Sequence, residues 1–152
     1  MKPCIIALLL VLLAACAAPR PEAPPVFQPT VATPEALQSA LAALPGAEAL
    51  DGEIGIRYPG EVLFAAGAVL PLPGGLKLLD PLAEVLLAHP GNAWTLRVRA
   101  ATEHGRDYDL ELAEGRAALL QRFLTRRGVA AERLEWQVEA EAGAPLEVRP
   151  RP

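Results

Sequence analysis

Hydrophobic and polar residues alternate in several short stretches of the chain, with the period of two that a half-buried strand requires. The stretch 94–100, WTLRVRA, alternates without a fault, and 54–58 and 133–142 follow the same rule. Val62–Phe64 is a further apolar run that we expect to be extended. The predicted strands carry these residues on their buried sides: Ile54, Ile56 and Tyr58; Trp94, Leu96, Val98 and Ala100; Leu134, Trp136, Val138 and Ala140.

Three other stretches repeat hydrophobic residues every three or four positions, which is typical of a helix with one buried stripe. The first covers 34–45, with Thr33 as its N-cap and a proline in its first turn. The second covers about 75–89, and Asp80-Pro81 leaves open whether it begins at Pro81 or earlier with a kink. The third covers about 109–127. The expected stripes of the second and third helices are Leu78, Leu79, Leu82, Val85 and Leu86, then Leu110, Ala113, Ala117, Leu120, Phe123 and Leu124.

The elements follow one another in the order β-α-β-α-β. Amphipathic helices in such an order cover one face of a sheet that pairs the strands. We therefore predict an α+β fold, a two-layer β-α-β-α-β sandwich. A turn at 143–145 leads into Leu146–Arg149, and the pattern leaves open whether this stretch adds a short final strand.

The first 33 residues differ in composition from the rest of the chain. Residues 1–15 contain one lysine, Cys4 and an apolar run shorter than the roughly 20 residues that span a bilayer, so we predict a signal peptide. The tetrad Leu13–Cys16 (LAAC) resembles the lipobox of bacterial lipoproteins. That resemblance implies cleavage before Cys16 and its acylation, as with palmitate, and the following Ala17-Ala18 favours the periplasmic face of the outer membrane. The proline-rich stretch 16–33 is expected to be an extended tether.

Charge and side-chain chemistry narrow the range of functions. The chain has 14 basic and 18 acidic residues and a formal net charge of −4, which argues against binding nucleic acid. Its single serine, Ser39, lies in the first predicted helix, and His89 and His104 have no Cys or His neighbours at metal-binding spacing. No residues are arranged as a nucleophile with a base. We expect no enzyme, no metal site and no cofactor.

The run from Tyr58 to Leu134 resembles the OmpA-like C-terminal domain, the family that includes the peptidoglycan-associated lipoproteins. The resemblance extends over 53–149, nearly all of the predicted folded part. It implies a β-α-β-α-β fold with a further final strand, and non-covalent binding of peptidoglycan at the free end of diaminopimelate in the stem peptide. The matching pieces are Leu63-Phe64 with Gly67, Leu79 through Leu86, Leu112, Arg116-Ala117, Gly128-Val129 and Arg133-Leu134.

The free end of diaminopimelate carries an ammonium and a carboxylate, so a binder needs one acid and one arginine at a fixed separation. The family motif Gly-His-Thr-Asp maps onto Ala100–Glu103, and the motif Leu-Ser-x-x-Arg-Ala maps onto Leu112–Ala117. The resemblance therefore implies that Glu103 and Arg116 bind the ligand. Thr102 matches the family, and Asp109 takes the place of the family's helix-start Asn.

The chain departs from the family pattern in four places. Alanines replace the glycine and the histidine, the acid is one methylene longer, and the loop from Glu103 to the helix is about two residues shorter. The chain ends LEVRPRP, so we expect the family's closing Asn-Arg-Arg strand to be absent or much reduced.

Two functions remain open at this point. In the first, an outer-membrane lipoprotein binds peptidoglycan, and Glu103 and Arg116 converge on one open pocket. In the second, the altered domain keeps the fold and binds an envelope protein, a role that exposed apolar side chains at Ala100 and Ala101 would favour. Arg106 and Asp107 are an alternative charge pair.

Overall fold

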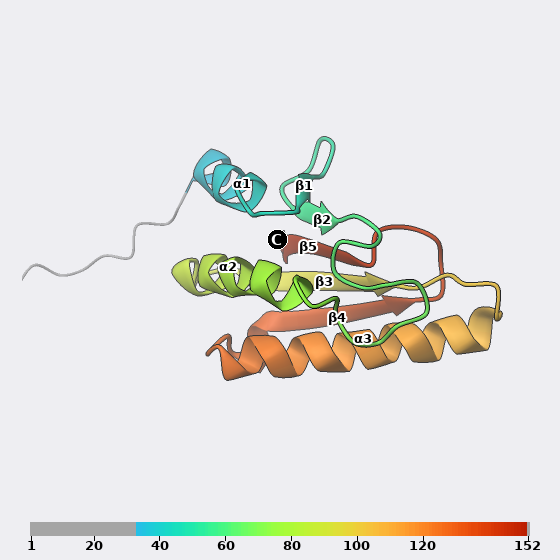
Figure 1. Ribbon diagram of the computed structural model, residues 1–152. Coiled ribbons are helices and arrows are strands. Elements are labelled where there is room, and N and C mark those ends of the chain that lie inside the picture. The colour runs from blue at the N-terminus through green and yellow to red at the C-terminus, as the bar shows by residue number, and fades with distance from the viewer. Residues whose placement is uncertain (1–32, 152) are drawn as a thin grey trace, which may run out of the picture. The chain divides into compact units, whose positions relative to one another are not determined.

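A five-stranded sheet backed by helices makes up the part of the chain that the computed structural model describes, residues 33–151 (Figure 1). The predicted signal peptide, Cys16 and all of the predicted tether except Thr33 lie outside the described residues. The α+β fold predicted from the sequence is confirmed. The elements are α1 (Pro34–Ala42), β1 (Glu48–Ala49), β2 (Ile56–Tyr58), α2 (Gly75–Ala88), β3 (Ala93–Arg99), α3 (Arg106–Arg126), a 3-10 turn (Ala131–Arg133), β4 (Leu134–Glu139) and β5 (Leu146–Arg151).

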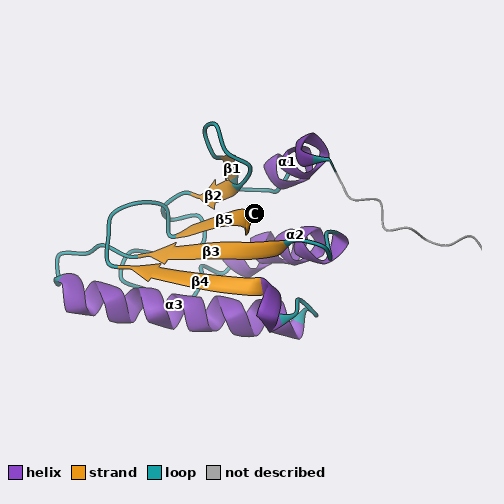
Figure 2. Ribbon diagram, turned by 180° about the vertical axis from the view of Figure 1, so that it is seen from behind, coloured by secondary structure: helices purple, strands orange, loops and turns teal. Residues whose placement is uncertain are grey.

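The final strand lies in the middle of the sheet, whose order is β1-β2-β5-β3-β4 (Figure 2). β3 and β4 are parallel and joined through α3, whereas β5 is antiparallel to both β2 and β3. The expectation that the closing strand is absent or much reduced is therefore wrong. Leu146 and Val148 continue the alternation of hydrophobic and polar residues. Pro150 lies beyond Val148, the last residue of β5 that pairs with β2, so its missing amide costs the sheet little.

The core fills the space between the sheet and the helices. Alternate residues of β2, β3 and β5 are fully buried on the face that α2 and α3 cover, as the period of two predicts. Leucines of α2 and α3 meet them, and α1 adds Leu37 and Leu41 to the same cluster. Among residues 33–151 there is no helix that is both long enough and hydrophobic enough to span a bilayer.

α1 and α2 begin where the pattern predicts, and α3 begins three residues earlier. α2 starts at Gly75 with Pro81 inside it, so the earlier of the two starts is the observed one. α3 starts at Arg106, and the buried position in its first turns belongs to Asp109, which is 6% exposed, whereas Leu110 is 38% exposed. The prediction of Leu110 in the buried stripe is wrong because a hydrogen bond satisfies the Asp109 carboxylate and allows its burial.

Two predicted apolar stretches are less regular than expected. Trp136, Val138 and Ala140 are only half-buried, because β4 is an edge strand with a neighbour on one side alone. Val62–Phe64 forms no strand: Leu63 and Phe64 are buried in a loop, and one isolated bridge joins Phe64 to Pro71. This loop leads from the sheet to the candidate site.

The other face of the sheet carries charged side chains that pair across neighbouring strands. Glu147 on the central strand is 7% exposed and lies 2.5 Å from Arg99 and 3.1 Å from Arg149. Burial alone would raise the pKa of Glu147, but the hydrogen bonds and charges of Arg99 and Arg149 outweigh it and hold that pKa below its usual range. The sheet is therefore apolar on one face and ion-paired on the other.

Candidate functional site

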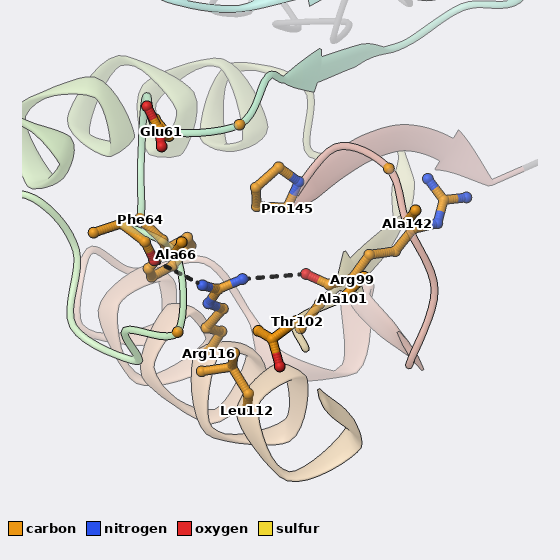
Figure 3. Close-up of a pocket in the computed structure, with 15 residues that line it drawn as sticks. Glu61, Phe64, Ala66, Arg99, Ala101, Thr102, Leu112, Arg116, Ala142 and Pro145 are labelled. Atoms are coloured by element: carbon orange, nitrogen blue, oxygen red, sulfur yellow. Dashed lines mark hydrogen bonds between the residues drawn. The ribbon is translucent and has the colours of Figure 1, made fainter. Parts of the chain in front are cut away.

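A pocket of about 220 Å³ opens where β3 ends, between α3, the loop after β2 and the loop from β4 to β5 (Figure 3). Its charged lining residues are Glu61, Arg99 and Arg116. Phe64, Thr102 and Leu112 contribute larger side chains, and most of the remaining lining is alanine and glycine. Small side chains leave the space that makes the pocket.

Arg116 extends from α3 into this pocket and is held by backbone carbonyls of two separate segments. Its Nε donates to the Ala68 oxygen at 2.9 Å, one terminal nitrogen donates to Ala65 at 3.1 Å, and the other donates to Arg99 at 3.3 Å. The guanidinium carbon lies 4.8 Å from the centre of the Phe64 ring, a cation–π distance. The side chain is thereby fixed, with only 4% of the residue exposed.

The positive charge of Arg116 has no carboxylate partner among residues 33–151, since carbonyl oxygens are dipoles without net charge. Burial lowers the pKa of Arg116, against an opposing effect of Tyr108, yet a guanidinium remains protonated in proteins. Three of its five N–H groups are used, which leaves two for a ligand. A buried cation without a counter-ion is matched best by a bound anion, and a carboxylate fits its planar fork.

The loop 65–69 is fixed against α3 by contacts on both sides of Arg116. The Tyr108 hydroxyl donates to the Gly67 carbonyl at 3.4 Å. Val69 packs against Gly115, where an added Cβ would lie 3.2 Å from two Val69 carbons, closer than ordinary van der Waals contact. A glycine inside a helix costs about 1 kcal/mol relative to alanine, so its presence here serves this close approach. The two loop carbonyls that hold Arg116, those of Ala65 and Ala68, are thus placed by α3 itself.

Thr102 and Asp109 bond to each other, and only Thr102 lines the pocket. The Thr102 hydroxyl donates to the Asp109 carboxylate at 2.6 Å and accepts from the His104 backbone N–H at 3.2 Å. Asp109 lies in the first turns of α3, where a negative charge is favoured by the helix dipole. The pair therefore braces the short loop between β3 and α3.

Glu103 is exposed on the turn after β3 and is not among the residues that line the pocket. Arg116 and Thr102 do line it, so the structure brings together two of the four predicted ligand-binding residues. Arg106 and Asp107, the alternative pair, are exposed in the first turn of α3 and outside the pocket. Their ligand-binding roles and that of Glu103 stay predictions.

The two alanines in place of Gly-His have different positions. Ala100 is buried at the end of β3, and Ala101 is exposed at the pocket. They therefore do not form a shared exposed apolar surface.

Sequence reasoning missed Glu61 and Arg99 as pocket residues. Glu61 follows Pro59-Gly60, a turn signal that marks a loop but not the direction of the next side chain. Arg99 stands on the polar side of the predicted β3 strand, and nothing in the alternation shows that it borders a pocket.

Within residues 33–151, no three His, Cys, Asp or Glu side chains are close enough to hold a metal ion together. His89 follows the last residue of α2, and its Nδ1 lies 2.8 Å from the Val85 carbonyl. Its position agrees with the interpretation of a helix-end histidine.

No family model and no curated protein matches the chain. Among solved structures, a MotB-like protein from Desulfovibrio vulgaris is 21% identical with a TM-score of 0.58, over 76% of this chain and 90% of its own. An outer membrane protein from Borrelia burgdorferi B31 is 17% identical with a TM-score of 0.53, over 68% of this chain and 93% of its own. The OmpA-like domain of FopA1 from Francisella tularensis is 12% identical with a TM-score of 0.53, over 68% of this chain and 79% of its own.

These likenesses concern the fold, since all three identities are below 25%. They share the mixed α+β fold described above. The resemblance that the sequence motifs indicated is confirmed at this level: the described chain has the fold of an OmpA-like domain.

Proposed function

We propose that this protein binds peptidoglycan non-covalently through the Arg116 pocket and links it to the outer membrane. The ligand is the free end of diaminopimelate in the stem peptide, whose carboxylate pairs with Arg116. In this proposal Cys16 carries the lipid anchor on the periplasmic face of the outer membrane, and 16–33 is the tether that spans the gap to the wall.

The observation that carries the proposal is the unmatched charge of Arg116. Its side chain is fixed by three carbonyls, retains two N–H groups and faces a pocket rather than a carboxylate of its own chain. An arginine whose role is only structural would be expected to have all of its donors or its charge satisfied internally. A ligand carboxylate supplies what is missing.

The size of the pocket agrees with a ligand end. Water takes about 30 Å³ per molecule in the liquid, and pockets for whole drug-sized ligands have roughly 300–1,000 Å³. The observed volume of about 220 Å³ suits the ammonium and carboxylate of one amino-acid end, with the rest of the peptide outside. The name of the Borrelia burgdorferi neighbour, an outer membrane protein, is consistent with a place in the envelope.

Co-sedimentation with purified peptidoglycan tests the proposal, with the chain from Ala17 to Pro152, which contains every described residue. Arg116→Gln removes the charge at similar size and should reduce the pelleted fraction at least tenfold, because a charge-assisted pair contributes about 1.5–3 kcal/mol. Arg126→Gln, on the exposed last turn of the same helix and outside the Arg116 pocket, is the matched control. Unchanged pelleting by a folded Arg116→Gln variant would contradict the proposal.

A second candidate function is binding of an envelope protein, and an apolar groove between α2 and α3 favours it. The groove has about 340 Å³ and is lined mainly by Leu70, Leu76, Leu119 and Phe123, with Leu70 and Leu76 exposed. A photo-crosslinker at Leu76 in intact cells tests this function. A discrete protein adduct that Leu70→Glu abolishes would support it, and the absence of any adduct would count against it.

A further inference from the structure

The lining of the Arg116 pocket contains one carboxylate and one guanidinium without an oppositely charged partner among residues 33–151. Of its three charged residues, Arg99 is neutralised by Glu139 at 2.8 Å and by Glu147 at 2.5 Å. Glu61 forms no ion pair and no side-chain hydrogen bond within residues 33–151. Glu61 and Arg116 are therefore the free charges, and they have opposite signs.

The backbone of Glu61 supports a role for its side chain. Its φ is +65°, and it is the one non-glycine residue with a positive φ in the described part of the chain. The left-handed region is disfavoured for residues with a Cβ, and glycine is the usual residue there. Such outliers gather at ligand sites, where the side chain compensates for the backbone cost. A glutamate at this position thus indicates that its carboxylate is used.

We propose that Glu61 is the acid that binds the ammonium of the ligand, opposite the Arg116 guanidinium that binds its carboxylate. This inference rests on the proposed function and replaces Glu103 as the ammonium ligand. In Figure 3 Glu61 and Arg116 both border the pocket, with Glu61 above Arg116 in this view. Both glutamates are exposed, but Glu61 borders the same cavity as Arg116 and Glu103 lies outside its lining.

A pocket with one carboxylate and one guanidinium recognises both charges of an amino-acid end. A ligand with only the carboxylate satisfies Arg116 and leaves Glu61 without a partner, whereas a ligand with only the amine satisfies Glu61 alone. The pocket therefore selects a zwitterionic end, and Glu61 supplies the part of the affinity that depends on the ammonium.

Calorimetric titration of the Ala17–Pro152 chain tests the assignment with two probes: a stem tripeptide ending in diaminopimelate, and the same peptide without the side-chain amine. Glu61→Gln should weaken the first probe at least tenfold and leave the second within twofold. Glu111→Gln, an exposed acid on α3 outside the pocket lining, is the matched control and should leave both unchanged. Equal affinity of wild type and Glu61→Gln for the first probe would overturn the proposal, as would equal losses for both probes.

Two further variants, Arg116→Gln and Glu61→Gly, distinguish a failure of the Glu61 assignment from a failure of the proposed function and from misfolding. If wild type binds neither probe, or Arg116→Gln binds both as wild type does, the proposed function fails, and the role of Glu61 fails with it. If Arg116→Gln loses both probes while Glu61→Gln keeps the first, only the role of Glu61 fails. Glu61→Gly removes the carboxylate and relieves the backbone, so it should raise the Tm while it weakens the first probe. A variant that loses both Tm and binding would show that Glu61 serves only the fold.

Discussion

Arg116 links the loop after β2 to α3, and the same side chain leaves part of its charge free for a ligand. The carbonyls of Ala65, Ala68 and Arg99 orient the guanidinium before any ligand arrives. Fixing the side chain in advance reduces the entropy that binding would otherwise cost. The residue that holds the loop can therefore also be the residue that binds.

The hydrogen bond between Thr102 and Asp109 is expected to stabilise the loop between β3 and α3. Thr102→Val keeps the shape but leaves the buried Asp109 carboxylate without its 2.6 Å donor, so it should lower the free energy of unfolding by about 1–3 kcal/mol. Urea unfolding measures the loss. Thr102→Ser retains the hydroxyl and should stay within about 1 kcal/mol of wild type. Equal stability of Thr102→Val and wild type would show that the bond contributes nothing.

At this scale the sequence predicted the residue types of the site better than their contacts. Arg116 and Thr102 were identified through motif spacing and do line one pocket. Glu61 was not, because a left-handed backbone at a glutamate leaves no sign in a hydrophobic pattern. The carbonyl partners of Arg116 depend on loop geometry, which side-chain periodicity does not describe.

The C-terminal end of α2 is held by a long side chain from another part of the chain. Arg133, just before β4, donates to the Leu86 and His89 carbonyls at 2.9 and 2.6 Å and to Asn92 at 2.9 Å. The last carbonyls of a helix have no partner within it, so this arginine closes the end of α2. It connects two elements that are far apart in the chain.

Removing this cap should be costly. Arg133→Ala leaves three carbonyls without their donors and should lower the free energy of unfolding by about 2 kcal/mol. Arg133→Lys cannot span all three carbonyls and should lie between this variant and wild type. Thermal unfolding measures both, with Arg126→Ala on the exposed side of α3 as control. A loss no larger than that of the control would contradict the capping role.

The ion-paired face of the sheet makes stability depend on pH. The folded pKa of Glu147 lies below its unfolded value, so its contribution is present above about pH 4.3 and is lost as pH falls through the folded pKa. Glu147→Gln lacks this contribution and should be less stable than wild type by about 1.5–3 kcal/mol at pH 7, the range for a charge-assisted hydrogen bond. Urea unfolding between pH 3 and 7 should show this difference shrinking on acidification. A difference that is constant with pH would contradict the ionic origin.

Element types were predictable wherever a single period held over enough residues. β3 alternates cleanly because it is flanked by strands on both sides and covered by helices on one face. β4 shows the same alternation but is only half-buried, since burial depends on its place at the edge and not on its own pattern. The hydrophobic period predicts Leu110 in the core. It cannot show that Asp109, whose carboxylate accepts a hydrogen bond from Thr102, is buried there instead.

The whole molecule depends on a strand formed by the last residues of the chain. β5 pairs with β2 on one side and β3 on the other, and without it the sheet divides into two pieces. A chain that ends at Gly143 loses Leu146 and Val148 from the core and leaves two unpaired strand edges. We expect it not to fold, as shown by loss of dispersion in its amide NMR spectrum. A chain that begins at Thr33 and keeps β5 should retain the wild-type dispersion. A folded chain ending at Gly143 would contradict this account.

The two-layer arrangement followed from the sequence, and the order of strands did not. Amphipathic helices between alternating strands imply one covered face, whatever the order in the sheet. The central position of β5 depends on long-range pairing, which its short pattern ending in Pro150 and Arg151 does not show. The site lies where β3, the loop before β5 and α3 meet, so its lining could be known only once that order was known.

The central claim is that the Arg116 guanidinium binds the carboxylate of a diaminopimelate end, and its terminal Nη–H resonance reports this directly, because the Nε–H already donates to Ala68. The measurement is an NMR titration of the Ala17–Pro152 chain, with Arg116→Gln to assign the signal. The account predicts that this resonance shifts in a saturable way with the diaminopimelate tripeptide and remains in place when the same carboxylate is amidated. An Nη–H signal that stays unmoved at saturating tripeptide, or that moves equally with the amidated peptide, would contradict the claim.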